Sequence, residues 1–255
     1  MADERLAGRV AIITGGAGGI GSAVARALVE QGARVALVDK NVAQLERVAG
    51  EVGSALPITA DVTVEEDVQG YVHKTVEELG RVDFFFNNAG IEGPTTSIPD
   101  TPVAEFDRVI AINVRGVYLG LQAVLPALER QGSGGSIVCT ASMAGLHGGA
   151  RFAPYIASKH AVIGLARTAA LEAAEFGVRV NAIAPGFIDT RMLDAIYRSR
   201  AGDDHEAARQ AGVARVPLRR LGSPDDVARL VRWLFSDESA YITGSVQVID
   251  GGLMA

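Results

Sequence analysis

The sequence predicts an α/β fold in which a parallel sheet is covered by helices on both faces. Short β-rich runs alternate with helical patterns along the 255 residues, and no repeat, low-complexity stretch or linker interrupts them. Several runs, such as 10–13 and 35–38, are continuously apolar, which is typical of parallel strands buried on both faces. Strand–helix alternation implies right-handed crossovers and therefore a doubly wound sheet. We expect one domain spanning residues 1–255.

The individual elements follow from local composition and from signals at their ends. We expect strands at 10–14, 34–38, 56–59, 82–87, 135–140, 179–184 and 245–249. Helical patterns lie near 19–31, 41–50, 64–79, 103–130, 154–176 and 224–235. Ser223 and Pro224 provide a cap residue and a proline at the first helical position, and Gly177 is placed to end a helix. The stretch 190–221 is the longest interruption and predicts a substrate-loop insertion.

Composition narrows the class of protein. The net charge of −6 argues against a surface for nucleic acid or anionic membranes. Residues 1–9 contain no apolar signal-peptide core, and no apolar run approaches the roughly 18 residues that span a bilayer. The single cysteine, Cys139, excludes an internal disulfide and fits a reducing compartment, so we expect a cytoplasmic protein. The four histidines show no ligand spacing, so no metal site is expected.

A glycine-rich segment follows the first expected strand and opens the first expected helix. Gly16, Gly18 and Gly21 match Gly-x-Gly-x-x-Gly, while Gly15, Gly19 and Gly21 match Gly-x-x-x-Gly-x-Gly. Glycines allow the backbone to approach a pyrophosphate, and the helix N-terminus offers unpaired N–H groups to it. A glycine-rich turn alone is weak evidence, but the strand before it and the helix after it predict a dinucleotide site.

Acidic residues after the second and third strands predict the adenosine end of that site. Asp39 ends the second strand, where a carboxylate accepts hydrogen bonds from ribose hydroxyls and repels the 2′-phosphate of NADP. Lys40 adjoins it and could accommodate such a phosphate, so the preference for NAD over NADP is favoured rather than fixed. Asp61 could accept the adenine amino group or cap the next helix. The amide and small residues at 87–90 suit a backbone pressed against a cofactor.

A tyrosine–lysine pair predicts proton-transfer chemistry. Lys159 follows Tyr155 by four residues, and such positions share a helix face with Cβ atoms roughly 5–6 Å apart. A free tyrosine has a pKa of about 10, and we expect the neighbouring ammonium to lower it toward the operating pH. Ser142, from a preceding strand end, is placed to hold a substrate oxygen. Taken alone, Tyr-x-x-x-Lys is a weak pattern that chance also produces.

Together these residues resemble the short-chain dehydrogenase/reductase family, in its form of about 250 residues. The motifs are Thr14-Gly15-x-x-x-Gly19-Ile20-Gly21, Asp61, Asn87-Asn88-Ala89-Gly90, Asn113, Ser142, Tyr155-x-x-x-Lys159 and Pro185-Gly186-x-x-x-Thr190. The resemblance covers nearly the whole chain and implies a Rossmann fold with seven parallel strands in the order 3-2-1-4-5-6-7. Segments 106–121 and 155–192 are most similar to bacterial reductases of cyclic ketones or diols, of the levodione and cyclohexanol types.

The resemblance implies a role for each matching residue. Tyr155 would be the general acid or base, Lys159 would lower its pKa and bind ribose hydroxyls, and Ser142 would hydrogen-bond the substrate oxygen. Asn113 would hold a water that links Lys159 to solvent. The expected contacts with NAD are Gly15, Gly18, Gly19, Ile20, Asp39, Lys40, Asp61, Val62, Asn88, Ala89, Gly90, Tyr155, Lys159, Pro185, Gly186, Ile188 and Thr190.

The expected substrate is a small or medium secondary alcohol or ketone, with cyclic compounds among the candidates. A largely apolar pocket is expected from Ser142, Ala144, His147, Phe152, Phe187 and Met192. A 3-oxoacyl-carrier-protein reductase is an alternative, although Asp39 and the negative charge count against its usual NADPH and basic docking surface. A non-catalytic dinucleotide sensor is a second alternative. The apolar segments 103–130 and 154–176, with the family resemblance, predict a homotetramer.

Overall fold

Seven parallel strands form the centre of the molecule, which the computed structural model describes over residues 6–255. The strands are β1 (Val10–Thr14), β2 (Arg34–Asp39), β3 (Ala55–Thr59), β4 (Phe84–Asn87), β5 (Gly135–Thr140), β6 (Val178–Pro185) and β7 (Val246–Ile249). Their order is β3-β2-β1-β4-β5-β6-β7, and every neighbouring pair is parallel. The predicted doubly wound fold and strand order are therefore confirmed. The expectation of no leader falls partly on residues 1–5, outside the described residues.

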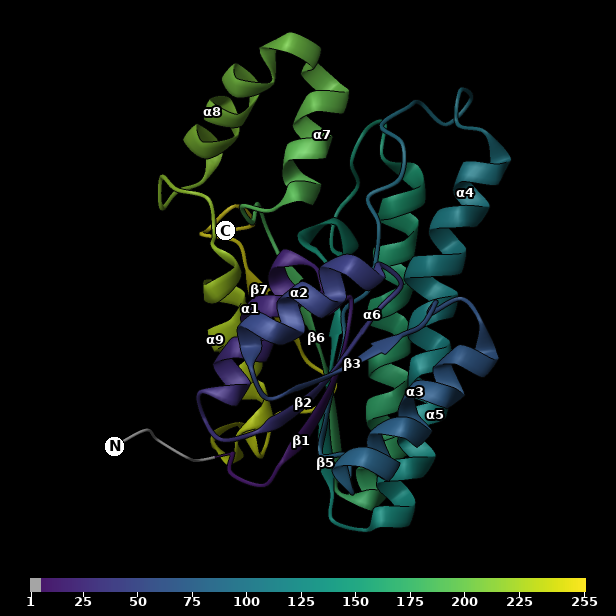
Figure 1. The fold of residues 1–255 in the computed structure, drawn as a ribbon. Coiled ribbons are helices and arrows are strands. Elements are labelled where there is room, and N and C mark those ends of the chain that lie inside the picture. Colours follow the sequence, from purple (N-terminus) through teal and green to yellow (C-terminus); the bar gives the residue numbers. More distant parts are fainter. Residues whose placement is uncertain (1–5) are drawn as a thin grey trace.

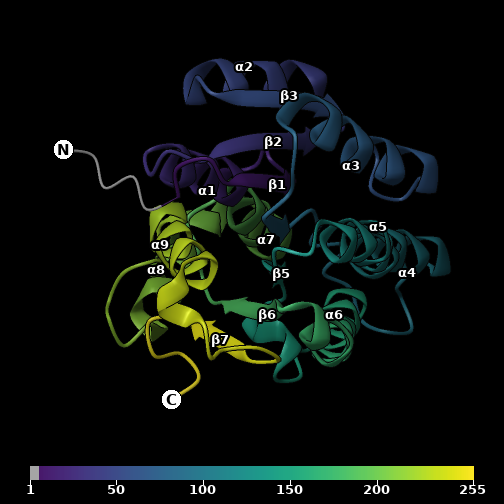
Figure 2. The same ribbon diagram turned by 90° about the horizontal axis from the view of Figure 1, so that it is seen from below.

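Helices cover both faces of the sheet (Figures 1 and 2). They are α1 (Gly19–Val29), α2 (Val42–Val52), α3 (Glu65–Leu79), α4 (Val103–Ile110), α5 (Gly116–Gln131), α6 (Ala153–Ala173), α7 (Arg191–Ala201), α8 (His205–Arg215) and α9 (Pro224–Phe235). The helix expected over 103–130 is interrupted by a π-helical segment at Ala111–Arg115. The stretch 190–221 contains α7 and α8, which stand above the carboxyl ends of the strands (Figure 1). Its role as a substrate loop stays a prediction.

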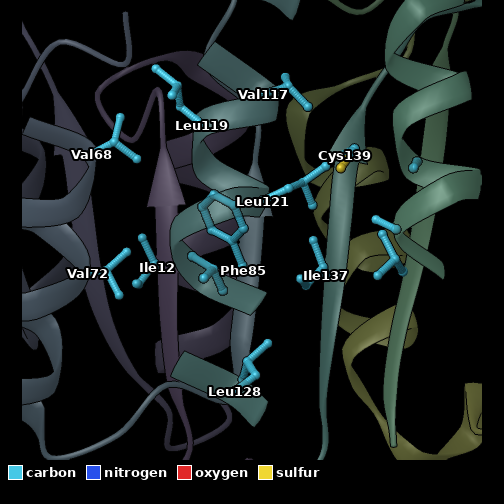
Figure 3. Close-up of a cluster of buried hydrophobic side chains, with 14 of the residues drawn as sticks. Ile12, Val68, Val72, Phe85, Val117, Leu119, Leu121, Leu128, Ile137 and Cys139 are labelled. Carbon is cyan, nitrogen blue, oxygen red and sulfur yellow. The ribbon is translucent and has the colours of Figure 1, made fainter. Parts of the chain in front are cut away.

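The core consists of two apolar layers on either side of the sheet. Successive strand residues point to opposite faces, so the fully buried Ile12 and Ile13 belong to different layers. One layer packs α3, α5 and α6 against the sheet, with Phe85 and Ile137 near its centre (Figure 3). The other packs α1, α2 and α9. Burial on both faces is the reason that the strands read as continuous apolar runs.

Strand β4 begins at Phe84, later than the expected 82–87, and the backbone groups of Val82 are held by a side chain instead of a neighbouring strand. The side-chain amide of Gln131 accepts from the Val82 N–H at 3.0 Å and donates to its carbonyl at 2.9 Å. The buried Asp83 carboxylate accepts hydrogen bonds from Arg9, Arg81 and the Val10 N–H. Val82 is therefore tied to α5, whereas the backbone of Asp83 still bonds to Val10 of β1 and Ser136 of β5.

The helix-end signals are confirmed in the structure. The Ser223 hydroxyl accepts from the Asp226 N–H at 3.1 Å, and the Asp226 carboxylate accepts from the Ser223 N–H at 2.8 Å. This reciprocal pair is a capping box at the start of α9. Gly177 follows α6 and its short 3₁₀ extension with a φ of 70°, the left-handed conformation that ends many helices.

One helix in the described residues, Val103–Gln131, is long and apolar enough to cross a membrane by length and composition alone. It contains the π-helical segment and the buried Asn113. Its apolar residues Val117, Leu121 and Val124 belong to the core layer next to the sheet. A core helix of this kind passes the same test, so the helix carries no argument for a membrane span.

Candidate active site

The candidate site lies at the carboxyl ends of the strands, where the strand order reverses between β1 and β4. Such a reversal is where doubly wound sheets bind ligands. Thr14, the last residue of β1, joins the two strands because its hydroxyl accepts from the N–H groups of Asn88 at 2.9 Å and Ala89 at 3.1 Å. The Asn88 side chain in turn donates to the Thr14 carbonyl at 3.0 Å. Thr14 therefore ties the end of β1 to the residues that follow β4, a role that the sequence alone does not predict.

The glycine-rich segment forms a cradle at the start of α1. Gly18 is the N-cap of α1 and provides no side-chain cap, so the first N–H groups of the helix are available to an anion. Gly21 faces Gly15 so closely that a Cβ on Gly21 would lie 2.3 Å from the Gly15 carbonyl oxygen. Gly19 lies beside the Thr190 side chain, which brings two expected cofactor segments together. Ile20 is half-buried next to them.

The Asp39 carboxylate is fixed against this cradle. Its oxygens accept from the Ala17 N–H at 3.2 Å and from the Asn41 N–H at 3.0 Å, while Lys40 is exposed. Asp61 forms a local turn, because one of its oxygens accepts from both the N–H and the hydroxyl of Thr63. The N–H of Thr63 is the main cause that lowers the pKa of Asp61.

The structure shows where Asp61 and the other expected cofactor contacts lie. Val64, not Asp61, is the N-cap of α3, and Val62 packs against Gly116 of α5. Gly90 lies beside the Lys159 ammonium.

The segment after β6 forms the other side of the site. Pro185 ends β6, and the Gly186 N–H donates to the Ile249 carbonyl. Ile188 forms a β-bridge with Gly222. Contact of these residues with a cofactor stays a prediction.

Tyr155 and Lys159 lie together on α6, buried at the edge of the sheet. The Lys159 ammonium lies 5.5 Å from the centre of the Tyr155 ring and donates to the Thr140 carbonyl at 2.7 Å. Burial raises the pKa of Tyr155 to about 12, although a hydrogen bond with the Ser142 side chain opposes the rise and the Glu92 charge adds to it. The expected lowering of the tyrosine pKa by Lys159 is therefore wrong for this structure, because burial dominates and the ammonium points to Thr140.

Burial also shifts the pKa values of Lys159 and Cys139. It lowers the pKa of Lys159 to about 8, against a small opposing effect of Cys139. It raises the pKa of the Cys139 thiol to about 12, so this cysteine is not a nucleophile at neutral pH. Burial thus favours the neutral form of both Tyr155 and Lys159.

Ser142 follows β5 and lies within reach of both the tyrosine and the end of β6. Its hydroxyl accepts from the Ala144 N–H at 3.1 Å and approaches the Pro185 carbonyl at 3.4 Å. The backbone of Ser142 is extended, which directs the chain away from β5 and across the front of α6. The structure therefore brings Ser142, Tyr155 and Lys159 together, as the sequence predicts.

Asn113 occupies the π-helical segment and acts through its side chain on two neighbours. The amide oxygen accepts from the Ile91 N–H at 2.8 Å, and the amide nitrogen donates to the Ile91 carbonyl at 2.9 Å. The same nitrogen donates to the Ser158 hydroxyl at 3.0 Å. Both amide protons are thereby used, so the side chain positions other residues. The expected link from Asn113 through water to Lys159 stays a prediction.

The predicted substrate residues divide into two groups. Ala144 and Phe152 form an apolar cluster with Tyr155, joined by Ile196 from α7. The Phe152 and Tyr155 rings lie 4.8 Å apart between centres. The exposed Arg200 of α7 lies with its guanidinium carbon 5.2 Å from the Phe152 ring centre.

Within residues 6–255, His147, Phe187 and Met192 are not members of that apolar cluster. His147 pairs through Nδ1 with the Gly148 carbonyl, and its Nε2 is buried without a partner. Phe187 lies under the guanidinium of Arg215 from α8. Met192 is half-buried at the start of α7. Their place in a substrate pocket stays a prediction.

The donor set fits a dinucleotide and offers little to a metal. Across residues 6–255, no three histidine, cysteine or acidic side chains are grouped so as to hold a metal ion. The uncapped start of α1, the Gly15–Gly21 contact and the Asp39 carboxylate form a cradle for a pyrophosphate and an adjacent ribose. When bound, a nicotinamide dinucleotide supplies the hydride chemistry, and this chain supplies orientation and proton transfer.

The fold and the site together define a dinucleotide-dependent oxidoreductase, and comparison with known proteins gives its family. The family described as enoyl-(acyl carrier protein) reductase matches residues 15–254. The chain therefore belongs to the short-chain dehydrogenase/reductase family.

Three relatives cover almost the whole chain. Levodione reductase from Leifsonia aquatica is 40% identical over 98% of this chain and 96% of its own. Its crystal structure matches with a TM-score of 0.95, covering 97% of this chain and 98% of that one. Cyclohexanol dehydrogenase from Acinetobacter sp. (strain SE19) is 36% identical, over 95% and 94% of the two chains. NAD⁺-bound xylitol dehydrogenase is 37% identical with a TM-score of 0.93, covering 97% and 100%.

The Gly21 contact generates the first prediction. Gly21→Ala places a Cβ 2.3 Å from the Gly15 carbonyl oxygen, so the cradle must open. We expect the Kd for NADH to rise at least about tenfold in a fluorescence titration, since preorganised contacts are lost. Gly50→Ala is the control, because its Cβ meets nothing within 4 Å in α2. It should keep NADH affinity and gain about 0.5–1 kcal/mol in stability. Equal NADH affinity in both variants would contradict the cradle.

Proposed function

We propose that this protein is an NAD(H)-dependent oxidoreductase that interconverts a secondary alcohol and a ketone. The observation that carries the proposal is the buried group of Ser142, Tyr155 and Lys159 at the carboxyl edge of the sheet. A phenol with a hydroxyl partner and a lysine on the same helix face is suited to exchange a proton with an alcohol or carbonyl oxygen.

The proton transfer follows from these residues. In ketone reduction the Tyr155 hydroxyl donates its proton to the carbonyl oxygen, and in alcohol oxidation its phenolate accepts the hydroxyl proton. Ser142 hydrogen-bonds the same substrate oxygen and stabilises its developing charge. Because burial raises the pKa of Tyr155 to about 12, proton donation is the easier role at neutral pH. Proton acceptance, and with it alcohol oxidation, improves as the pH rises.

A small or medium, often cyclic, secondary alcohol is the proposed substrate. The relatives act, by their names, on levodione, cyclohexanol and xylitol. The apolar cluster of Ala144, Phe152 and Ile196 beside Tyr155 suits a hydrocarbon ring. A 3-oxoacyl-carrier-protein reductase activity is the second candidate within the family, and the chain's net charge of −6 disfavours an acidic carrier as partner.

NAD is the proposed cofactor in preference to NADP, because the fixed Asp39 carboxylate would repel a 2′-phosphate. A cytoplasmic location without nucleic-acid or membrane partners is proposed from the charge and from the single reduced cysteine. A purely dinucleotide-sensing role has no use for an intact Ser142, Tyr155 and Lys159 group, which favours an enzyme.

A homotetramer is the proposed assembly. The outer surfaces of α4, α5 and α6 expose the large apolar side chains Val103, Phe106, Tyr118 and Leu171, which is more than isolated surface residues require. Light scattering coupled to size-exclusion chromatography should give about four times the chain mass of 26.6 kDa. A mass equal to one chain would refute the tetramer.

Cofactor reduction tests the function directly. We would follow reduction of NAD⁺ and of NADP⁺ by absorbance against a panel of cyclic and linear secondary alcohols. Turnover with NAD⁺ supports the proposal, and the best alcohol measures the size of the pocket. Tight NADH binding without turnover on any alcohol or ketone of the panel would instead favour the sensor.

Tyr155→Phe removes the proton carrier and keeps the ring. We expect kcat to fall by about a thousandfold, since general acid–base catalysis contributes about 10²–10⁴. The Kd for NADH, measured by fluorescence titration, should remain within about twofold because the hydroxyl alone is lost. Turnover close to that of the unmodified protein would refute the catalytic role of Tyr155.

Asp39→Ala removes the carboxylate at the cradle. We expect the ratio of kcat/KM for NAD⁺ to that for NADP⁺ to fall by about tenfold or more, because repulsion of the 2′-phosphate disappears. Lys40→Ala is the matched control and should shift the ratio toward NAD⁺. An unchanged ratio in the Asp39 variant would show that this carboxylate does not discriminate between the two cofactors.

A further inference from the structure

Two arginines lie together at the outer end of the apolar cluster beside Tyr155. Arg200 of α7 has its guanidinium carbon 5.2 Å from the ring centre of Phe152, and that ring lies 4.8 Å from the ring of Tyr155. Arg151 directly precedes Phe152, and its Nε donates to the Thr95 carbonyl at 3.4 Å. Phe152 therefore contacts both the catalytic phenol ring and the guanidinium of Arg200.

Contacts between three segments at the carboxyl ends of the strands fix this arrangement. Thr95, in the loop after β4, is buried, and its hydroxyl hydrogen-bonds with that of Ser199 on α7 at 2.6 Å. Arg151, in the loop after β5, donates to the carbonyl of the same threonine. Ile196 of α7 packs against the apolar cluster, and Arg200 follows it by four residues on the same helix face. The docking of α7 thus directs Arg200 toward the site.

Arg151 has an unfavourable backbone conformation. Its φ is 63°, in the left-handed region that disfavours residues with a Cβ. Non-glycine residues in such conformations cluster at active sites and ligand clamps, where the surroundings hold them in place. Glycine would adopt this φ without penalty. The turn itself therefore does not call for an arginine, and the guanidinium needs another explanation.

Neither guanidinium is neutralised by a carboxylate. Within residues 6–255, the ion pairs involve other arginines, and neither Arg151 nor Arg200 has an acidic partner. The stretch 190–221, which carries Arg200, contains seven arginines and four acidic residues, a net charge of +3 in a chain of net charge −6. Its helices stand above the carboxyl ends of the strands (Figure 1). A basic segment in that place attracts anions to the site.

We propose that Arg151 and Arg200 bind an oxyanion at the far end of the substrate, so that the preferred substrates are secondary alcohols or ketones that carry a carboxylate or phosphate group. This inference rests on the proposed function and names its substrate class. A guanidinium offers only hydrogen-bond donors and is always charged, so its best partner is a negatively charged acceptor. The apolar cluster of Ala144, Phe152 and Ile196 would contact the part of the substrate between the reacting carbon and the oxyanion.

The oxyanion takes no part in the reaction. The reacting carbon gives a hydride to NAD⁺ and its hydroxyl gives a proton to Tyr155, which yields the corresponding oxo acid and NADH. The guanidiniums bind the oxyanion equally well before and after hydride transfer. Such uniform binding lowers KM and leaves kcat nearly unchanged, so the loss of an arginine should appear in KM.

The experiment compares matched substrates on the full-length protein. We would measure kcat and KM with NAD⁺ for 3- and 4-hydroxycyclohexanecarboxylate, for their neutral methyl esters, for 4-hydroxycyclohexyl phosphate and for 4-aminocyclohexanol. At least one oxyanion should exceed the methyl esters in kcat/KM by about tenfold or more, because charge-assisted hydrogen bonds are the stronger ones. The carboxylates and the phosphate distinguish the two forms of the oxyanion. Added KCl should raise KM for the oxyanion and not for the esters, because salt screens exposed charges.

Three variants separate anion binding from structure. Arg200→Ala should lower the ratio of kcat/KM for the preferred oxyanion to that for the methyl esters by about tenfold, through KM. Arg151→Gly should lower the same ratio, and glycine accepts the φ of 63° at this position, so the turn is kept. Arg198→Ala is the matched control, because it removes the same charge from an exposed position of the same helix. It should leave the ratio unchanged.

The outcomes distinguish the inference from the function beneath it. Turnover of the methyl esters without an oxyanion preference would overturn the role of the two arginines and leave the proposed function standing. Equal losses for oxyanion and ester in Arg200→Ala would show that this arginine only packs on Phe152, and would also overturn it. A preference for 4-aminocyclohexanol over every oxyanion would give the selecting charge the opposite sign, with the same consequence. No oxidation of any alcohol with NAD⁺ would mean that the proposed function itself fails.

Discussion

The side-chain amide of Asn113 is the interaction on which the site geometry depends. It holds Ile91 after β4 and donates to Ser158 on α6. Ser158 in turn donates to the Tyr155 carbonyl at 2.8 Å. One buried amide therefore joins the loop after β4 to the helix that carries the catalytic tyrosine. Because buried amides are costly when unpaired, all three segments are held in one arrangement.

Burial is the second constraint on the site, because it disfavours the charged forms of Tyr155 and Lys159. The sheet edge excludes water from Tyr155 and Lys159, so both lose stabilisation of their charged forms. In such a place a single nearby charge has a large effect, since the local dielectric is low. The Ser142 hydrogen bond lowers the pKa of Tyr155 and the Glu92 charge raises it, each with a smaller effect than burial. The site is tuned by a few groups and not by the overall charge of the chain.

The sequence predicted the fold well because buried parallel strands leave a direct apolar pattern. It also predicted that Tyr155 and Lys159 lie together, because a spacing of four residues puts them on one helix face. It failed where a property arises only from packing. The raised pKa of Tyr155 needs the depth of burial, which four-residue spacing does not contain. The hydrogen-bonding roles of Thr14 and Ser158 were not predicted, because hydroxyls at strand ends and in helices are common. The expected helix over 103–130 gave no sign of its π-helical segment.

The π-helical segment limits which changes in chain length the protein can tolerate. The π-helical residues Ala111–Arg115 put α4 and α5 out of phase, so Asn113 faces the site while Val117, Leu121 and Val124 face the sheet. A deletion of one residue here would leave the composition almost unchanged. It would nevertheless rotate every later side chain of α5 by about 100° and separate the two faces from their partners. The segment is thus intolerant of a change in length.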